Sequence, residues 1–521
     1  NNPARIVDEA KNQGWDQHKF ISNFWGEIQL LEGLSFRSNF SSDLSFDHSK
    51  NYYPEFNIRK TPAERRQVSE LNESRGTNFS WNWSNYLTYQ KAFGDHSVNV
   101  MGGQEANLAQ WSSISGRATL VPADPSQQFL GASKATEALV GSGQGEVSLL
   151  SFFGRVNYSY KSRYALTVTG RYDGSSRFAK GNQWGFFPSF AAAWNVTNED
   201  FMQHIAVISQ LKVRAGYGEV GNQAVLGVSD YITTVTNQQR YSFNNNPVEG
   251  RIPTTLSNPE LIWESSNMIN VGIDWGFLDD KLNLTTEYFI RDTEDMLVTV
   301  PIPEYVGAYA PKANAGTMRN SGFEFSVLYK STVGELKYDV GLNMSFINNE
   351  LMNLGGGQPF ESGNVNKVGN TTKVEEGMPF PYFFGYQTDG IFNTEEELAA
   401  YVNGDGLLIQ PNAKPGDVKF RDINNNGAID PGDRVNLGNP FPKYSGGFSI
   451  GLEYKSFDLK AFLVFSGGHQ VVNSLIRWNE DVTGILNSTT NRLDRWTASN
   501  TTSNEPRMTR ADANENMRFS D

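Results

Sequence analysis

The chain has 521 residues and a formal charge of −13 at neutral pH, from 44 basic and 57 acidic side chains. This acidic balance excludes nucleic acid as an expected partner, because nucleic-acid-binding proteins carry a basic face. The absence of cysteine from the sequence excludes disulfides and thiolate chemistry. No apolar run reaches the roughly 18 residues of a membrane helix, whereas a membrane β-barrel stays possible because only alternate residues of its strands face lipid.

Alternation of apolar and polar residues is the main structural signal along the chain. From Leu34 to Phe46 the apolar residues fall mainly at even positions, and Ser, Asn, Asp and Arg fill the odd ones. Such stretches predict about fourteen strands, most of them near the nine to eleven residues that a tilted strand needs to cross a bilayer. We expect them at residues 20–31, 34–46, 79–90, 96–104, 151–160, 164–172, 187–195, 211–218, 266–277, 282–291, 321–330, 336–348, 445–454 and 457–465.

The connections between these strands alternate between short turns and long links. Outer-membrane barrels have short periplasmic turns and long extracellular loops. The chain therefore predicts an all-β fold, a transmembrane antiparallel β-barrel, over residues 1–521. The expected extracellular loops are 47–78, 105–150, 219–265, 292–320 and 349–444.

A soluble β-sandwich or propeller also has many alternating strands. Large outward-facing aromatics such as Trp81, Trp83 and Trp194 would need to be covered in such a protein. In a barrel they face lipid, so the barrel is the favoured interpretation. Because the chain opens at Asn1 without a signal peptide and stops at Asp521 without a terminal strand, we expect both ends of the barrel protein to be missing.

Several motifs are similar to those of one transporter family. They are Gly154–Tyr158, Arg171–Phe178, Trp184–Ser189 with Trp194, Lys212–Arg214 with Gly216–Asn222, Asn258–Pro259 with Trp263–Glu264, Asn314–Gly316, Asn320–Glu324, Glu376–Pro379, Gly438–Pro440 and Pro442–Lys443. Together they resemble the SusC/RagA-type TonB-dependent outer-membrane transporters over nearly the whole chain.

The resemblance implies a barrel of about 22 strands with a plug in its lumen, in the outer membrane of a Gram-negative bacterium. It implies active uptake of bulky nutrients such as oligosaccharides or peptides, energised through TonB, with a SusD-like surface lipoprotein as a lid and outer-membrane lipid around the wall. We find neither a plug domain nor a TonB-contacting box in this sequence. No gating residue is therefore assigned.

One short segment has the spacing of a calcium-binding loop. Oxygen ligands at positions 1, 3, 5, 7, 9 and 12, with glycine at position 6, let one loop wrap a hard cation. Position 12 is aspartate instead of glutamate, so we expect weak binding. The alternative is a turn cluster in which Asn and Asp bond to their own backbone. The candidate ligands are Asp422, Asn424, Asn426, the carbonyl of Ala428, Asp430 and Asp433.

No motif in the sequence predicts catalysis. The five histidines lack metal-ligand spacing, and no phosphate-binding loop or nucleophile elbow is present. We expect the charged residues Arg171, Asp173 and Arg177 to pair structurally on the inner wall. Aromatic loop residues could stack on sugars, but packing between loops or an interfacial belt is the commoner role; these residues are Tyr305, Tyr309, Tyr382, Phe383, Phe384 and Tyr386.

Three function classes therefore stay open. The favoured one is a TonB-energised importer that is not an enzyme. A passive porin or an adhesin-like barrel is the first alternative, and a soluble carbohydrate-binding β-protein is the second.

Overall fold

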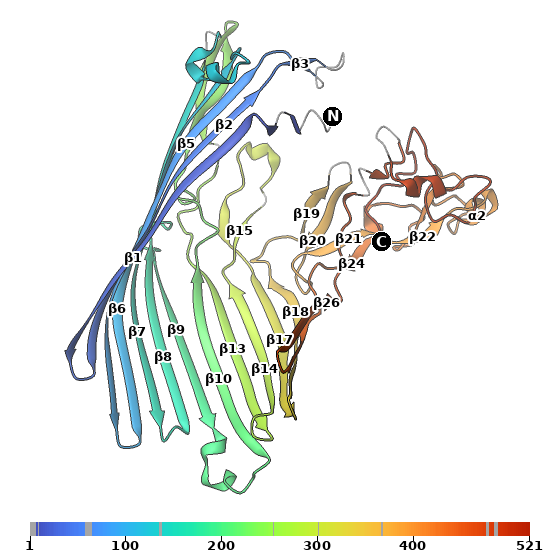
Figure 1. Cartoon of the computed structure of the whole chain (residues 1–521). Helices are drawn as coiled ribbons and strands as arrows, with labels where there is room; N and C mark the ends of the chain where they lie inside the picture. Colours follow the sequence, from blue (N-terminus) through green and yellow to red (C-terminus); the bar gives the residue numbers. More distant parts are fainter. Residues whose placement is uncertain are drawn as a thin grey trace. The chain divides into compact units, whose positions relative to one another are not determined.

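The computed structural model describes residues 7–8, 10–57, 65–134, 138–253, 255–300, 302–365, 368–475, 479–483 and 488–521. Fourteen long strands form one sheet, in which they follow one another in chain order (Figure 1). This sheet confirms the predicted all-β class and the expected set of strands. The strands are β1 Gln13–Leu31, β2 Leu34–Tyr53, β5 Glu70–Phe93, β6 His96–Thr119, β7 Leu139–Tyr160, β8 Tyr164–Ser175, β9 Trp184–Asn195, β10 Ile208–Asn222, β13 Glu264–Phe277, β14 Leu282–Glu294, β17 Thr317–Val333, β18 Leu336–Asn353, β25 Tyr444–Tyr454 and β26 Phe457–Gly467.

The strand registers explain why the alternation predicted the sheet. Phe40 of β2 lies opposite Phe24 of β1 and Trp83 of β5. The next position, Asn39, lies opposite Ser84. Since side chains alternate between the two faces of a strand, these registers give the sheet one apolar face and one polar face.

Several strands extend further toward the long loops than predicted. Strands β5 and β6 have 24 residues each, and β2 has 20. Residues 47–53, 70–78, 105–119 and 139–150 are therefore strand, so the predicted loops 47–78 and 105–150 were wrong at both ends. The alternation fades there because Ser, Gly, Asn and charged residues occupy both faces, while the backbone ladder continues.

The other predicted loops also begin and end inside strands, and they contain structure of their own. Residues 219–222, 264–265, 292–294, 317–320 and 349–353 are strand. A hairpin and a short strand pair lie in the loops after β10 and β14. Their strands are β11 Val235–Phe243 with β12 Asn246–Pro253, and β15 Leu297–Thr299 with β16 Lys312–Asn314.

The short turns join the strand pairs that were predicted to form hairpins, but some are shorter than predicted: residues 94–95 connect β5 to β6, where the predicted strands left 91–95. The turn between β1 and β2 is Glu32–Gly33, where Gly33 has a φ of 78° and a Cβ would collide with the carbonyl oxygen of Gln90. Glycine tolerates this left-handed conformation without steric cost. Lys161 and Ser162 have left-handed φ values of 52° and 54° in the three-residue turn between β7 and β8.

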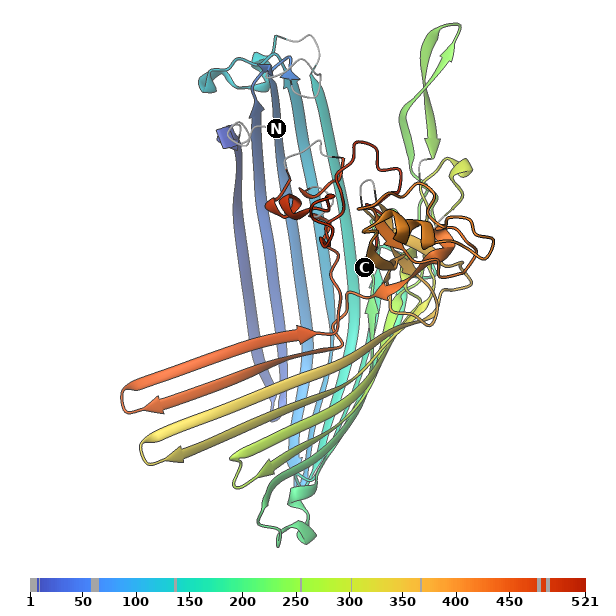
Figure 2. The same cartoon turned by 90° about the vertical axis from the view of Figure 1, so that its right-hand side faces the viewer.

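The chain divides into two compact units, which we describe separately. The first comprises residues 1–199, 214–266 and 297–314, and the second comprises 200–213, 267–296 and 315–521. In the first unit, strands β1, β2 and β5 to β9 run side by side in that order (Figure 2, blue to teal). No helix in the described part of the chain is long and apolar enough to cross a membrane.

The second unit carries a folded segment between β18 and β25. Four strands form a small sheet in the order β19–β20–β21–β24, and β22 pairs with β23. A short helix of six residues, α2, follows β22. Its N-cap is Thr394, whose side chain accepts a hydrogen bond from the backbone amide of Glu397. The elements are β19 Phe360–Val365, β20 Gly369–Val374, β21 Tyr382–Tyr386, β22 Thr388–Ile391, α2 Glu395–Ala400, β23 Val418–Phe420 and β24 Arg434–Gly438.

Candidate functional site

The apolar face of the first unit is broad and uncovered. On β7, β8 and β9 the even-numbered positions share this face, because Val156 lies opposite Val168 and Val168 lies opposite Phe190. Phe190 is 48% exposed and Val156 is 42% exposed. A continuous exposed apolar surface of this kind marks contact with a membrane or another protein.

A row of aromatic rings crosses this face near the short turns. The ring of Tyr160 lies 4.8 Å from His96 and 6.5 Å from Tyr164, which lies 6.5 Å from Trp194. Beside the row, the buried carboxylate of Glu199 accepts hydrogen bonds from the Tyr164 hydroxyl at 2.6 Å and the Trp194 indole at 2.9 Å. Amphipathic rings with satisfied polar ends are typical of the membrane–water interface.

A second aromatic row crosses the same face nearer the long loops. Trp184 stacks on Tyr172 at 4.8 Å and on Phe152 at 6.2 Å. Phe152 and Tyr160 are eight residues apart on β7, which is about 26 Å of strand. At a tilt of about 40° this corresponds to roughly 20 Å of height, close to the apolar band of about 25 Å in outer-membrane barrels.

The opposite face of the first unit carries paired charges. Arg171 contacts Asp173 through Nε and Oδ1 at 2.8 Å, and its Nη2 donates to Glu105 at 3.2 Å and to Ser151 at 2.9 Å. Lys19 pairs with Asp43 at 2.7 Å. The predicted structural pairing of Arg171 and Asp173 is therefore confirmed.

Arg177 has a different role from the one predicted. Its guanidinium donates to the carbonyl oxygens of Gln223, Ala224 and Leu226 instead of a carboxylate. The adjacent Phe178 is completely buried. Arg177 thus fastens the loop after β10 to the loop after β8.

Four of the motifs that carry the family resemblance contribute Phe178, Phe187, Asn222 and Trp263–Glu264 to this junction. Phe178, Phe187, Leu226, Leu261 and Trp263 pack with Leu297 into one core cluster. Glu264 accepts hydrogen bonds from Asn222 at 2.7 Å and from the amide of Leu297 at 2.9 Å. These motif residues therefore hold the bases of three loops together, so their role here is structural.

A hollow of about 640 Å³ lies on the wall of the second unit. Glu287 and Glu324 lie directly opposite each other on β14 and β17. Glu324 accepts a hydrogen bond from Ser345 at 2.9 Å, and Glu287 accepts one from Asn270 at 3.0 Å. Carboxylate, amide and hydroxyl groups at this hollow suit molecules rich in hydrogen-bonding groups. Its further polar lining residues are Thr285, Ser326, Asn343, Ser445 and Ser466.

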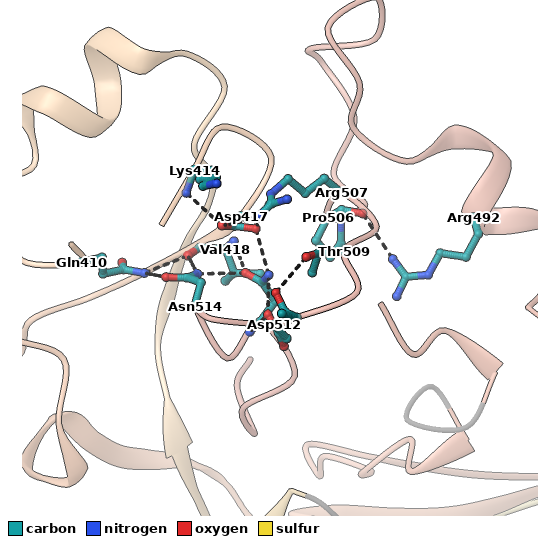
Figure 3. Close-up of polar contacts among 12 residues, drawn as sticks. Gln410, Lys414, Asp417, Val418, Arg492, Pro506, Arg507, Thr509, Asp512 and Asn514 are labelled. Atoms are coloured by element: carbon teal, nitrogen blue, oxygen red, sulfur yellow. Dashed lines mark hydrogen bonds and ion pairs between the residues drawn. The ribbon is translucent and has the colours of Figure 1, made fainter. Parts of the chain in front are cut away.

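The second unit also contains a buried polar network that joins two segments distant in sequence (Figure 3). The carboxylate of Asp417, which is completely buried, contacts Arg507 at 2.8 Å and accepts hydrogen bonds from Asn516 at 2.9 Å and from the backbone amide of Lys414 at 2.9 Å. Asn514 donates to the carbonyl oxygen of Val418 at 3.0 Å. The segment 488–521 is thereby bound to the segment 386–421.

The end of the chain strengthens this connection. Tyr386 donates its amide to the carbonyl oxygen of Phe519 and accepts from the amide of Asp521. The guanidinium of Arg518 lies 5.0 Å from the centre of the Tyr386 ring and 5.6 Å from that of Phe420. The sequence did not predict this docked segment, because its contacts join residues about a hundred positions apart and follow no periodicity.

The predicted aromatic loop residues fall into two groups. Tyr382 and Tyr386 are buried, and the guanidinium of Arg434 lies 4.5 Å above the Phe384 ring. Tyr382, Phe384 and Tyr386 therefore pack within the folded segment between β18 and β25, which agrees with the expected packing role of aromatic loop residues. Phe383 lies edge-on to Phe519. Tyr305 and Tyr309 are 90% and 73% exposed.

The predicted calcium loop forms a compact turn. The carboxylate of Asp422 accepts from the amides of Asn426 at 3.1 Å and Gly427 at 2.8 Å. The buried carboxylate of Asp433 accepts from the amides of residues 423, 424 and 430. Gly427 has a φ of 86°, which only glycine adopts without strain.

The candidate ligands of this loop are carboxylate and amide oxygens, the type of ligand that calcium prefers. Asn424 and Asn426 each use their side-chain oxygen to accept an amide, and Asp430 accepts from Gly432. A carboxylate keeps further lone pairs after two hydrogen bonds. Among the residues that the structure describes, however, no three His, Cys, Asp or Glu side chains are close enough together to hold a metal ion. Calcium binding stays a prediction, and the hydrogen bonds match the turn-cluster alternative.

An antiparallel wall with an apolar outer face, two aromatic rows and a polar inner face defines the class of outer-membrane β-barrels. A family model described as TonB dependent receptor-like, beta-barrel, matches residues 3–514. The chain belongs to this family. The family confirms the predicted resemblance and the predicted location in the outer membrane of a Gram-negative bacterium.

Three similar proteins illustrate the relationship. TonB-dependent receptor P3 of Formosa agariphila is 30% identical over 514 residues, which are 97% of this chain and 50% of the relative. SusC of Bacteroides thetaiotaomicron is 29% identical over 468 residues, covering 83% of this chain and 43% of SusC. The RagAB peptide transporter matches with a TM-score of 0.79 at 22% identity, covering 96% of this chain and 53% of that chain, which shows the fold alone. The chain thus spans about half the length of the relatives it matches.

Proposed function

We propose that this chain is part of the wall of an active importer of bulky nutrients. The observation that carries the proposal is the division of the wall into two faces, apolar outside and polar inside. A polar inner face with paired charges, such as Arg171 with Asp173 and Glu105, can line a water-filled passage. Membership of the TonB-dependent receptor family supports energy coupling through TonB, with a plug and the remaining strands of the barrel of about 22 strands supplied by the rest of the protein.

The cargo is proposed to be a peptide or an oligosaccharide. RagAB, with which the chain shares its fold, is a peptide transporter. The hollow beside Glu287 and Glu324 offers carboxylate, amide and hydroxyl groups, which hydrogen-bond to either kind of cargo. A SusD-like surface lipoprotein is proposed as the partner that closes the extracellular side, on the ground of the similarity to SusC.

The protein is proposed to act by binding and conformational gating instead of covalent chemistry. Charged groups on the first unit's wall form ion pairs with each other, as Lys19 does with Asp43 and Arg171 does with Asp173. The relatives are receptors and transporters by name, which supports the same role.

A passive porin or adhesin-like barrel remains the alternative, and one experiment separates it from the importer. Uptake of fluorescent peptides and oligosaccharides is measured in cells that carry the full-length protein, with and without a proton-gradient uncoupler. The importer predicts uptake that is lost with the gradient and lost in cells without TonB. Uptake that survives both treatments would contradict active import and favour a porin, and surface adhesion without uptake would favour an adhesin.

We also propose that residues 422–433 bind calcium weakly. The oxygen-rich spacing and the wrapped geometry around Asp422 and Asp433 support it. Thermal melting of the full-length protein is compared in calcium and in a chelator, for the natural sequence and for Asp422→Ala. A calcium-dependent rise in melting temperature that Asp422→Ala abolishes is expected. Identical melting with and without calcium would leave only the turn cluster.

A further inference from the structure

One tryptophan of the first unit lies on the polar inner face, apart from the two aromatic rows of the outer face. Trp111 on β6 lies opposite Asn78 on β5 and Gly145 on β7. It shares its face with Glu105, because the two residues are an even number of positions apart on one strand. Trp111 is 39% exposed although a strand flanks it on each side. Part of its ring is therefore accessible from the inner side of the wall.

The ring of Trp111 rests on the backbone of Gly145. A Cβ at Gly145 would lie 2.1 Å from Cζ2, 2.5 Å from Cε2 and 2.7 Å from Cη2 of the ring, so any other residue would displace the indole. Gly141 and Gly143 precede it on the same face of β7. From Gly141 to Gly145, about 13 Å of this strand therefore carries no side chain on the inner face, and the ring borders this open strip.

A row of hydrogen-bonded polar side chains lies on the other side of the ring. The carboxylate of Asp47 accepts from Gln17 at 2.7 Å and from Asn78 at 2.7 Å. Asn78 also donates to the Ser45 hydroxyl at 3.2 Å. The side-chain oxygens of Gln17 and Asn78 and the indole N–H of Trp111 have no hydrogen-bond partner within the part of the chain that the structure describes. These three groups can bind a ligand without giving up an existing contact.

The chemistry of these groups suits a neutral, hydroxyl-rich molecule. The free groups are two amide oxygens and one indole N–H, and none of them carries a charge. The face of an indole ring is electron-rich, so it attracts the slightly positive C–H groups on one face of a sugar ring. The hydroxyls at the edge of the same sugar both donate and accept hydrogen bonds. A ligand that ends in a carboxylate would instead meet the like charge of Asp47.

We propose that Trp111, Asn78 and Gln17 form a binding subsite for a neutral oligosaccharide on the inner wall. This proposal rests on the proposed import function and narrows the cargo to one of its two classes. A sugar ring stacked on Trp111 leaves the rest of the chain lying along the glycine strip. The hydroxyls of Ser113 and Ser115 border that strip, since they lie 3.8 Å and 3.2 Å from a Cβ built on the facing glycines. The strip thus offers further hydrogen-bonding groups to neighbouring sugar units.

Calorimetric titration of the full-length protein in detergent tests the subsite. The probes are neutral hexasaccharides of glucose, mannose, galactose and xylose, and neutral octapeptides serve for comparison. At least one hexasaccharide is expected to bind, and Trp111→Ala is expected to weaken that binding at least tenfold. The matched control is Trp83→Ala, which removes a tryptophan of similar exposure, 46%, from the outer face and should bind as the natural sequence does. Thermal melting verifies that both variants are folded.

A second variant keeps the tryptophan and changes only its support. Gly145→Ala puts a methyl group where the ring now rests, so it should tilt the ring and weaken hexasaccharide binding at least tenfold. Gly154→Ala is the control, because its Cβ would meet only the carbonyl oxygen of Met101, at an ordinary distance of 3.7 Å. It lies on the outer face of the same strand.

Three results would overturn the proposal. They are no binding of any hexasaccharide, equal binding by Trp111→Ala and the natural sequence, and binding of octapeptides alone that Trp111→Ala abolishes, which would assign the subsite to a peptide. The titration needs neither a proton gradient nor TonB. Failure of the subsite is therefore distinct from failure of active import, which the uptake experiment measures.

Discussion

Asp417 and Arg507 lie 90 residues apart in the sequence and form an ion pair, with 2.8 Å between Oδ1 and Nε. The carboxylate is completely buried, whereas the arginine side chain is 23% exposed. This pair joins the segment between β18 and β25 to the segment after β26, so the two fold as one body. Separating the two segments would therefore leave the buried carboxylate of Asp417 without its cation.

Removing Arg507 should therefore loosen both segments together. Arg507→Ala leaves a buried carboxylate without its cation, and breaking a buried pair in this way costs about 3–5 kcal/mol. Hydrogen exchange of the full-length protein is expected to rise in residues 386–421 and in residues 488–521. The matched control is Lys337→Ala, whose pair with Glu453 is exposed on both sides and contributes about 1 kcal/mol or less. Faster exchange in only one of the two segments would show that they are not coupled.

The core cluster in the first unit predicts a sharp contrast between two adjacent residues. Leu226 is 2% exposed inside the cluster, whereas Val225 is 45% exposed. Leu226→Ala should cost about 2–5 kcal/mol because it leaves a cavity, and Val225→Ala should change stability by about 0.5 kcal/mol or less. Urea titration of the full-length protein in detergent, followed by tryptophan fluorescence, measures both. Equal losses of stability in Leu226→Ala and Val225→Ala would mean that the core cluster does not stabilise the loops.

The small sheet of the second unit predicts a dependence on pH. Hydrogen bonds from Lys373 and Tyr382 hold the pKa of Glu375 below its usual value of 4.5, with the tyrosine hydroxyl at 2.8 Å. A carboxyl with a lowered pKa in the folded protein adds stability above its unfolded pKa, and that stability is lost as the pH falls through the folded pKa.

The variant Tyr382→Phe removes one of the two donors. The stability difference between the natural sequence and this variant should therefore be largest near neutral pH and shrink between about pH 5 and pH 3. Thermal melting across that range gives the measurement. A difference that does not change with pH would assign the effect to packing of the ring and not to the hydrogen bond.

Much of the fold was predictable from the sequence because the wall is built on a period of two. Phe36, Phe40 and Leu44 alternate with polar residues, and the structure pairs them with apolar partners on β5. The ends of the same strands were missed where both faces are polar, as at Asp47–Tyr53, because alternation depends on a difference between the faces. The ladder of backbone hydrogen bonds there follows from the neighbouring strand and not from local composition.

The polar network around Asp417 could not be predicted for a related reason. Asp417, Asn514 and Asn516 look like ordinary turn residues in the sequence. Their role depends on which segments meet, and that is set by the strand order between them. The predicted calcium loop was recognisable from spacing alone, but its hydrogen bonds agree equally with a turn that needs no metal.

The position of the wall in the membrane is the claim on which the proposed function depends, and nitroxide accessibility along β7 tests it most directly. Spin labels are placed at Val156 and Ser142, which share the outer face, and at Asn157 on the inner face. We predict that the label at Val156 is accessible to oxygen and shielded from a water-soluble nickel reagent, whereas the labels at Ser142 and Asn157 are accessible to nickel. A label at Val156 as accessible to nickel as the label at Ser142 would contradict a membrane-embedded wall.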